Sequence, residues 1–227
     1  MWVVRRRRMA AEIAHIFLTG AQELPPAPRE TERDGYFAPL VARARSGDAR
    51  AFEQLMLATE HRVVSVAWRM LGNREDARDA AQEVYLRVFK HLARFREGED
   101  FRGWLYRIAV NVCRDFARKR RAAGAEQLDE TELDREQGAF EISREGGDAE
   151  GLALRAQRLA LVRRALESLP AKERAALVLR DLEGLSTEEV ARVLGSRPVT
   201  VRSQVSSARA KVKAYCDRLS REGGPAR

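Results

Sequence analysis

The chain has few of the residues that build disulfide frameworks or metal sites. Cys113 and Cys216 are its only cysteines, and they lie far apart in the sequence. His15, His61 and His91 do not have the spacing of metal ligands. We therefore expect no disulfide framework and no metal, and this cysteine content fits a reducing cytoplasm. The sequence also contains no nucleophile–base pair and no phosphate-binding loop, so we expect neither enzyme activity nor a cofactor.

Long apolar runs and alternating strand patterns are absent as well. No stretch approaches the roughly 20 apolar residues that span a bilayer. Aromatic residues make up only 7%, while Leu, Ala, Arg, Glu and Val dominate, which predicts an all-α protein. Residues 1–34 resemble a signal peptide only superficially, because Glu12 and His15 interrupt the apolar part. We interpret them as a disordered leader, with Met1 and Met9 both possible as the start.

Basic and acidic residues are segregated along the chain. Residues 35–121 carry 18 Lys and Arg against 11 Asp and Glu, a net charge of +7, and residues 151–227 carry 16 against 8, a net charge of +8. Between them, residues 122–150 carry 2 against 10, a net charge of −8. Basic blocks suit a polyanion such as nucleic acid, because binding releases its condensed counterions. Solvated helix faces would explain the excess charge but not its segregation, so the pattern favours nucleic-acid binding.

Helical periodicity organises residues 35–121 into one compact domain. Apolar residues recur every three or four positions up to Gly72-Asn73, again after this turn, and a third time from Phe101. The third segment ends in the basic run Arg118–Arg121.

Residues 122–150 break this period and predict a linker. They are acidic, are punctuated by glycine and contain few large apolar residues, a composition typical of flexible segments. Periodicity returns at Leu152, is interrupted at Pro170 and continues to about Leu182. We therefore predict a second helical domain over residues 151–219 and a frayed tail over residues 220–227.

The second domain contains the signals for two helices joined by a tight turn. Ser186 and Glu189 have the spacing of a capping box, so a helix should start directly after Ser186. Gly195 stands where a C-cap residue with positive φ is expected. Pro198 suits the first turn of the next helix.

The second of these helices should have one buried and one polar side. Val201, Val205, Ala208 and Val212 recur at spacings of four, three and four, which predicts the buried side. A glycine turn followed by a polar helix is the helix-turn-helix arrangement, whose second helix enters the DNA major groove. Hydroxyl groups allow close approach to phosphates, and Arg and Gln form paired hydrogen bonds with base edges. A helical hairpin with a hydrophilic outer face is the alternative. The candidate DNA-contacting residues are Arg197, Thr200, Arg202, Ser203, Gln204 and Ser207.

Three motifs occur in order along the two domains. They are LGNREDARDAAQEVYLRVF (Leu71–Phe89), FRGWLYRIAVNVCRDFARKRR (Phe101–Arg121), and LPAKERAALVLRDLEGLSTEEVARVLG (Leu169–Gly195) followed by TVRSQVSSAR (Thr200–Arg209). Together they resemble the extracytoplasmic-function (ECF) sigma factors, small members of the bacterial sigma-70 family. The resemblance implies a region 2-like and a region 4-like domain, with core RNA polymerase and promoter DNA as partners.

The first motif implies a docking surface for core polymerase. In the family this helix binds a coiled coil of the largest subunit, and the polymerase flap is a further contact. An acidic patch on the polar side of the helix would steer a basic partner and fix its register. A solvated face on which Asp79 and Glu83 make internal ion pairs is the alternative. The candidate core-binding residues are Asp76, Asp79, Gln82 and Glu83.

The second motif implies recognition and melting of the promoter minus-ten element. The preceding loop, residues 95–100, resembles the one with which the family captures a flipped base, which needs a stacking surface to offset unstacking. Trp104 fits equally well as such a surface or as a core residue, and the run at Arg118–Arg121 fits either a DNA-backbone contact or a basic helix end. The candidate minus-ten residues are Phe101, Trp104, Asn111, Arg114, Arg118 and Lys119.

The third motif implies recognition of the minus-thirty-five element by the polar helix. It departs from the family pattern, since Arg197 and Val199 stand where Pro and Gly are common. Gln204 also replaces a frequent Arg or Lys, which puts the promoter sequence in doubt rather than the activity.

The resemblance implies further properties. We expect an anti-sigma protein as a second partner, a cytoplasmic location that such a partner could bring close to the membrane, and no stable homo-oligomer. In the family the segment between the domains threads toward the polymerase active-site cleft, so residues 122–150 would either mimic RNA or act as a solvated spacer. Two rival classes are a stand-alone helix-turn-helix regulator and a helical interaction protein. The regulator leaves the Leu71–Phe89 motif unexplained.

Overall fold

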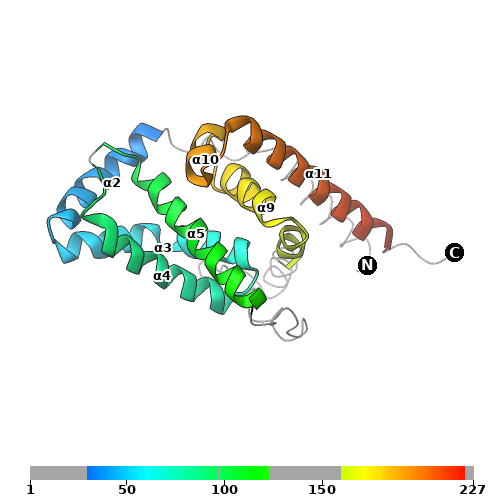
Figure 1. The fold of residues 1–227 in the computed structure, drawn as a ribbon, viewed down its shortest axis with the longest axis horizontal. Coiled ribbons are helices and arrows are strands. Elements are labelled where there is room, and N and C mark those ends of the chain that lie inside the picture. The colour runs from blue at the N-terminus through cyan, green and yellow to red at the C-terminus, as the bar shows by residue number, and fades with distance from the viewer. Residues whose placement is uncertain (1–29, 97, 123–159, 223–227) are drawn as a thin grey trace, which may run out of the picture.

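The described chain consists of helices that form two packed units (Figure 1). The structure is a computed structural model and describes residues 30–96, 98–122 and 160–222. The N-terminal unit comprises α2 (Glu30–Arg45), α3 (Ala49–Leu71), α4 (Arg74–Leu92) and α5 (Phe101–Ala122). The C-terminal unit comprises a helix over residues 160–167, α9 (Ala171–Leu177), η1 (Val178–Leu182), α10 (Thr187–Leu194) and α11 (Pro198–Glu222).

Local sequence fixes the turn between α3 and α4. Gly72 ends α3 in the left-handed conformation with φ of 73°, and its N–H donates to the carbonyl of Trp68. Asn73 then caps α4, because its side-chain oxygen accepts the N–H of Asp76. The predicted helix end at Gly72 is confirmed.

The helix-turn-helix signals are also confirmed. The Ser186 side chain accepts the N–H of Glu189, and the Glu189 carboxylate accepts the N–H of Ser186, so the capping box is complete. Gly195 has φ of 61°, in the left-handed region that glycine tolerates. Pro198 is the first residue of α11.

A π-helical segment between α9 and α10 was not predicted. The sequence indicated one helix to about Leu182, but the chain widens into η1 over its last five residues. The N–H of Glu183 donates to the carbonyl of Val178, and the N–H of Leu185 donates to that of Leu179. Such π-segments change which way the following side chains point. Here Asp181 becomes buried and Glu183 points toward the N-terminal unit.

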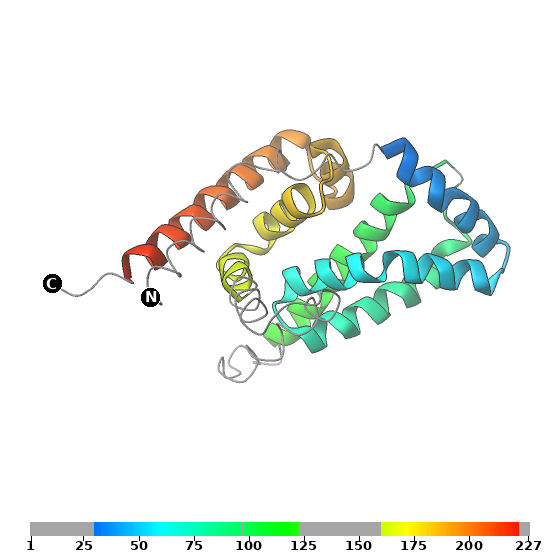
Figure 2. The same cartoon turned by 180° about the vertical axis from the view of Figure 1, so that it is seen from behind.

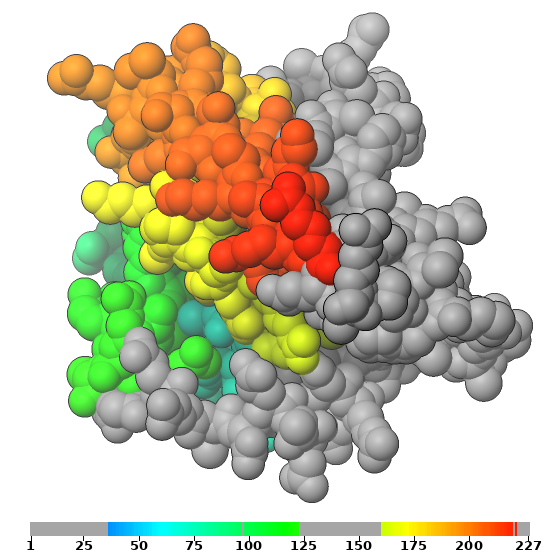
Figure 3. Space-filling model, turned by 90° about the vertical axis from the view of Figure 1, so that its right-hand side faces the viewer, coloured from blue at the N-terminus to red at the C-terminus, as the bar shows by residue number. Residues whose placement is uncertain are grey.

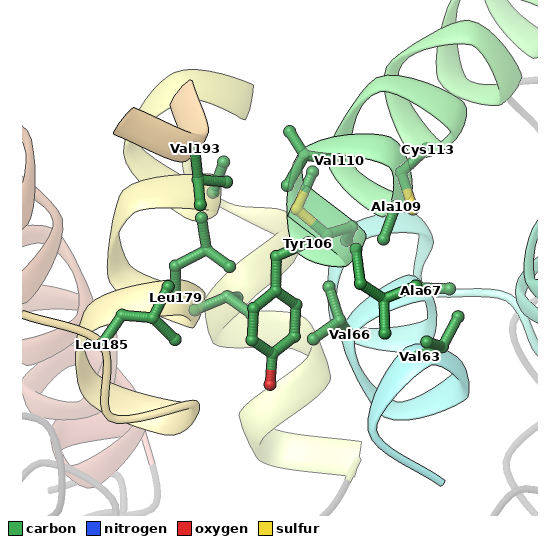
Figure 4. Close-up of a cluster of buried hydrophobic side chains, with 14 of the residues drawn as sticks. Val63, Val66, Ala67, Tyr106, Ala109, Val110, Cys113, Leu179, Leu185 and Val193 are labelled. Carbon is green, nitrogen blue, oxygen red and sulfur yellow. The ribbon is translucent and has the colours of Figure 1, made fainter. Parts of the chain in front are cut away.

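The two units share one apolar core rather than two separate ones. α10 contacts α5, while α9 and η1 contact α3, as the two opposite views show (Figures 1 and 2). Tyr106 of α5, only 1% exposed, lies at the centre of this contact. Its ring lies between Leu179 and Leu185 of the C-terminal unit and Val66 of α3 (Figure 4). The predicted pair of helical domains is therefore present, with a packed contact between them that the sequence did not indicate.

Polar contacts close this interdomain seam. The Glu183 carboxylate accepts hydrogen bonds from Arg69 Nη1 and from the Tyr106 hydroxyl, each at 2.7 Å. Arg107 Nη2 donates to the carbonyl of Arg192 at 2.8 Å. The side chain of Glu183 is only 7% exposed, so its charge depends on these donors.

Some predicted boundaries lie outside the described residues. Of the leader predicted over residues 1–34, residues 1–29 are not described, and residues 30–34 already belong to α2. The linker predicted over residues 122–150 is outside the described ranges except for Ala122, the last residue of α5. α11 continues to Glu222, beyond the predicted start of the tail. Within the described ranges, no helix is long and apolar enough to cross a membrane.

Replacing Glu183 by Gln should destabilise the protein. The amide still accepts the Tyr106 hydroxyl, but the guanidinium of Arg69 loses its charged partner in a poorly solvated position. We expect the free energy of unfolding in urea to fall by about 1.5–3 kcal/mol. Glu53→Gln, the same change at an exposed site of α3, should alter it by less than about 0.5 kcal/mol. Equal effects of the two changes would show that the Glu183 contacts do not stabilise the seam.

Candidate nucleic-acid and partner interfaces

The N-terminal half of α11 presents an exposed polar face. Val201, Val205, Ala208 and Val212 are all buried, which confirms the predicted inner side of the helix. The capping box and the Gly195 turn hold α10 against this helix and thereby fix its direction. Of the predicted DNA-contacting residues, those exposed are Arg197, Thr200, Arg202 and Ser203.

The other two predicted residues of α11 are less accessible. Ser207 is half-buried, and its hydroxyl donates to Glu173 Oε1 of α9 at 3.2 Å. Gln204 is also half-buried, and its side-chain oxygen accepts no hydrogen bond. Both would have to change rotamer to contact a base.

A basic groove runs beside α11 and adds residues that the sequence did not single out. Its volume is about 500 Å³, and its lining includes Arg180 of η1, Thr187 at the start of α10, and Arg202 and Lys213 of α11. The spacing of Arg202 and Lys213, eleven residues or three helical turns, could have indicated a shared side. The position of the Arg180 side chain in this lining depends on the direction of η1, which the sequence did not predict.

Arg209 lines the same groove but is held in an ion pair. Its Nε and Nη2 donate to the two carboxylate oxygens of Asp181 at 2.8 and 2.7 Å. The Asp181 side chain is only 2% exposed, and this hydrogen bonding raises the pKa of Arg209. Arg209 therefore fastens α11 to η1.

The predicted minus-ten residues of α5 divide into exposed and packed groups. Asn111, Arg118 and Lys119 are exposed, and Arg114 is half-buried. Trp104 is half-buried, and its ring centroid lies 5.0 Å from that of Phe95, so it is part of an aromatic cluster.

Phe101 does not fit a direct contact with DNA. It is 5% exposed, and its ring packs against Phe37, Phe95 and Trp104 at centroid distances of 5.7 to 6.0 Å. Its position at the start of α5, where the chain turns inward, makes it a core residue. Its assignment to the DNA-contacting group is corrected on this ground.

The acidic face of α4 is partly occupied by ion pairs. Asp79 and Gln82 are exposed, as predicted. Asp76, by contrast, accepts from Arg120 Nη1 at 3.1 Å, and Glu83 accepts from Arg87 Nε at 2.7 Å. The alternative of internal ion pairs at Asp79 and Glu83 is therefore met by Glu83. Among the described residues Asp79 forms no ion pair, and Asp76 is paired in its place.

Two large apolar side chains extend this face of α4. Leu86 and Phe89 are 65% and 68% exposed, and the Phe89 ring packs edge-to-face on Phe52 at 5.2 Å. The sequence analysis missed them, although both follow Gln82 at helical spacings of four and seven residues. An exposed apolar patch beside acidic groups is typical of a protein-binding surface.

Both cysteines lie in the described part of the chain and are buried. Burial raises the pKa of Cys113 to about 12 and that of Cys216 to about 11, so both thiols stay protonated at neutral pH. The described residues also contain no group of three or more His, Cys, Asp or Glu that could hold a metal ion.

Comparison with known proteins finds family models that match both units of the chain. Residues 55–123 match the model of sigma-70 region 2, and residues 159–212 match that of sigma-70 region 4. The chain is 36% identical over 188 residues to the RNA polymerase sigma-H factor of Pseudomonas aeruginosa, covering 81% of this chain and 95% of that protein. It is 34% identical over 172 residues to the ECF RNA polymerase sigma-E factor of Escherichia coli, covering 75% and 88% respectively.

Two solved structures have a similar fold. The structure of CnrH in complex with the cytosolic domain of CnrY has a TM-score of 0.59 and 29% identity, and the match covers 80% of this chain and 97% of that one. The sigma factor RpoE of Bartonella quintana, solved with the anti-sigma factor NepR, has a TM-score of 0.56 and 21% identity, and the match covers 74% and 98%.

Arg202 and Arg209 should respond differently to replacement by Ala. Arg202 is exposed, so its loss should leave stability unchanged but weaken binding to duplex DNA and lower the slope of log affinity against log salt by about 1. Loss of Arg209 removes the partner of a buried carboxylate and should lower the free energy of unfolding by about 2 kcal/mol. Fluorescence anisotropy and urea unfolding of both variants test this division. A destabilised Arg202→Ala or a fully stable Arg209→Ala would contradict it.

Proposed function

The chain belongs to the ECF group of the sigma-70 family of RNA polymerase sigma factors, and on this premise we propose that it directs core polymerase to promoters. In this proposal α11 contacts the minus-thirty-five element and α5 contacts the minus-ten element. The observation that supports the proposal most directly is the exposed side of α11, where Thr200 and Arg202 lie away from the buried Val201 and Val205. Arg197, directly before the helix, is exposed as well. A polar helix end held on a rigid helix pair suits insertion into a major groove.

Contacts of α11 would both position the protein and select sequence. Thr200, Arg202 and Ser203 are exposed within the first turns of α11 and can hydrogen-bond to base edges. Arg180 and Lys213 in the neighbouring groove would contact phosphates, which fixes register without selecting sequence.

The α5 surface suits a strand that is being opened. Asn111 is exposed in the middle of the helix, and Trp104 lies half-buried near its start. The exposed cations Arg118 and Lys119 follow along the same helix and would contact the DNA backbone. Stacking on an aromatic ring, together with backbone contacts, offsets the unstacking that melting requires.

Binding both promoter elements requires the seam to open. The side chain of Arg107 reaches the carbonyl of Arg192, so α5 and the helix before α11 touch each other. The two elements are about 25 base pairs apart by their names, or about 85 Å at about 3.4 Å per pair. Residues 123–159, which connect the units, would span at most about 120 Å if fully extended, at about 3.3 Å per residue. The connection is therefore long enough for the units to separate and bind both elements at once.

The face of α4 around Asp79, Gln82, Leu86 and Phe89 is the proposed docking surface for the largest-subunit coiled coil. Leu86 and Phe89 offer apolar area that water contacts in the free protein, and Asp79 offers a charge that orients a basic partner. We also place the flap on the C-terminal unit and an anti-sigma protein among the partners. The likeness to CnrH, solved with the cytosolic domain of CnrY, supports a second protein partner.

Run-off transcription with purified core polymerase tests the function. The template is a fragment from upstream of the protein's own gene, and binding to core polymerase is measured in the same preparation. Specific transcripts that require this protein would establish a sigma factor. Failure to bind core polymerase, together with tight duplex binding by the free protein, would instead establish a stand-alone regulator.

Leu86→Asp should weaken binding to core polymerase by at least about tenfold, because a charge replaces an apolar contact at the centre of the proposed interface. Leu57→Asp is a matched control, since Leu57 on α3 is 68% exposed against 65% for Leu86. Both variants should fold, and the control should bind like the wild type. Equal binding by the two variants in a pull-down titration would place the polymerase elsewhere on the protein.

A further inference from the structure

A cavity lies in the seam between the two units, beside the C-terminal end of α5. Its volume is about 310 Å³. Met70 of α3, Arg114, Arg120 and Arg121 of α5 and Arg174 of α9 contribute to its walls, so both units are needed to form it. The space-filling view from this side shows the 160–177 region directly beside the end of α5 (Figure 3).

The cavity is strongly positive. Among the described residues that line it, four guanidinium groups, from Arg114, Arg120, Arg121 and Arg174, stand against the single carboxylate of Asp76, a net charge of +3. That carboxylate is already bonded to Arg120 Nη1 at 3.1 Å. Among the described residues of the cavity wall, the guanidinium groups of Arg114, Arg121 and Arg174 therefore have no further carboxylate beside them.

Arg174 is held where it cannot move away from the other cations. Its Nη1 donates to the carbonyl of Met70 at 2.8 Å, and its Nη2 donates to the carbonyl of Glu167 at 2.9 Å. Its Nε is buried without a hydrogen-bond partner. Burial lowers the pKa of Arg174, Glu167 opposes this lowering, and Arg120 and Arg121 add to it. An anion bound between Arg174 and the arginines of α5 would offset the repulsion that Arg120 and Arg121 exert on Arg174.

We propose that this cavity binds a small anion carrying two linked phosphate groups. The guanidinium groups of Arg114 and Arg121 offer donors that match phosphate oxygens. Arg174, whose Nη atoms already donate to backbone carbonyls, adds its positive charge from the opposite wall. The volume lies at the lower limit of small-molecule sites, about 300 Å³, and so fits pyrophosphate or the diphosphate part of a nucleotide.

Such an anion would act on the arrangement of the two units. Arg174 belongs to the C-terminal unit and the other three arginines belong to α5, so only the closed form has the complete site. By mass action the ligand stabilises the closed form against the open one. If the proposed function is correct, the anion would oppose the separation that promoter binding requires. The binding itself does not depend on that function.

Isothermal titration calorimetry of the full chain with sodium pyrophosphate, at constant ionic strength, measures binding to this site. We expect one saturable site per chain, and a rise in Tm of roughly 5 to 10 °C at about one hundred times the Kd. Arg121→Gln should weaken binding about tenfold, because it removes one charged donor. Arg118→Gln is the matched control, since Arg118 lies on the same helix, is 78% exposed and does not line the cavity, and it should bind like the wild type.

Several outcomes would overturn the site. They are no saturable binding of pyrophosphate by the wild type, equal weakening in Arg118→Gln and Arg121→Gln, and an equal rise in Tm with sulfate at the same ionic strength. A parallel titration with adenosine diphosphate separates the two sources of the ligand. Tighter binding of the nucleotide would identify a nucleoside diphosphate, and tighter binding of pyrophosphate would identify the inorganic anion. No polymerase or DNA is present, so the result is independent of the transcription assay.

Discussion

The buried carboxylate of Glu183 is the constraint on which the relation of the two units depends. It accepts hydrogen bonds from Arg69 on α3 and from Tyr106 on α5, so both helices must be in place together. A carboxylate buried without such donors would be strongly destabilising. Burial raises the pKa of Tyr106, which keeps its hydroxyl protonated and able to donate. The direction of Glu183 in turn comes from η1, because the π-segment ends directly before it.

The packing that closes the seam also brings positive side chains together. Apolar contacts around Tyr106 and the Glu183 hydrogen bonds favour the closed form, whereas Arg174 is brought close to Arg120 and Arg121. The net stability of the contact is therefore a difference between opposing terms, as is usual for contacts that open in function. An RNA polymerase sigma factor that uses both units on one promoter needs such a reversible contact, since a fully satisfied seam would hold its two DNA-binding faces together.

In α11, the residues that anchor the helix differ from the exposed ones in their position along the helix as well as in the side that they occupy. Val201, Val205 and Val212 face the core, and farther along the helix Arg209 and Lys211 are fastened to Asp181 and Glu173. Its first two turns lack such ties and expose Arg202. Ion pairs thus fix the helix near its middle, while the polar side of its first two turns is available, which is the part that a helix-turn-helix places in the major groove.

The sequence by itself determined the elements whose signals are local. The helix end at Gly72, the capping box at Ser186, the turn at Gly195 and the buried stripe of α11 all depend on residues within one or two turns of each other. Only the tertiary structure decided the matters that depend on distant partners. Phe101 became a core residue because rings from other segments surround it, and Asp76 and Ser207 are engaged by side chains of other helices. The π-segment, the shared core and the arginine-lined cavity follow from packing between units far apart in sequence, and no periodicity within one helix carries that information.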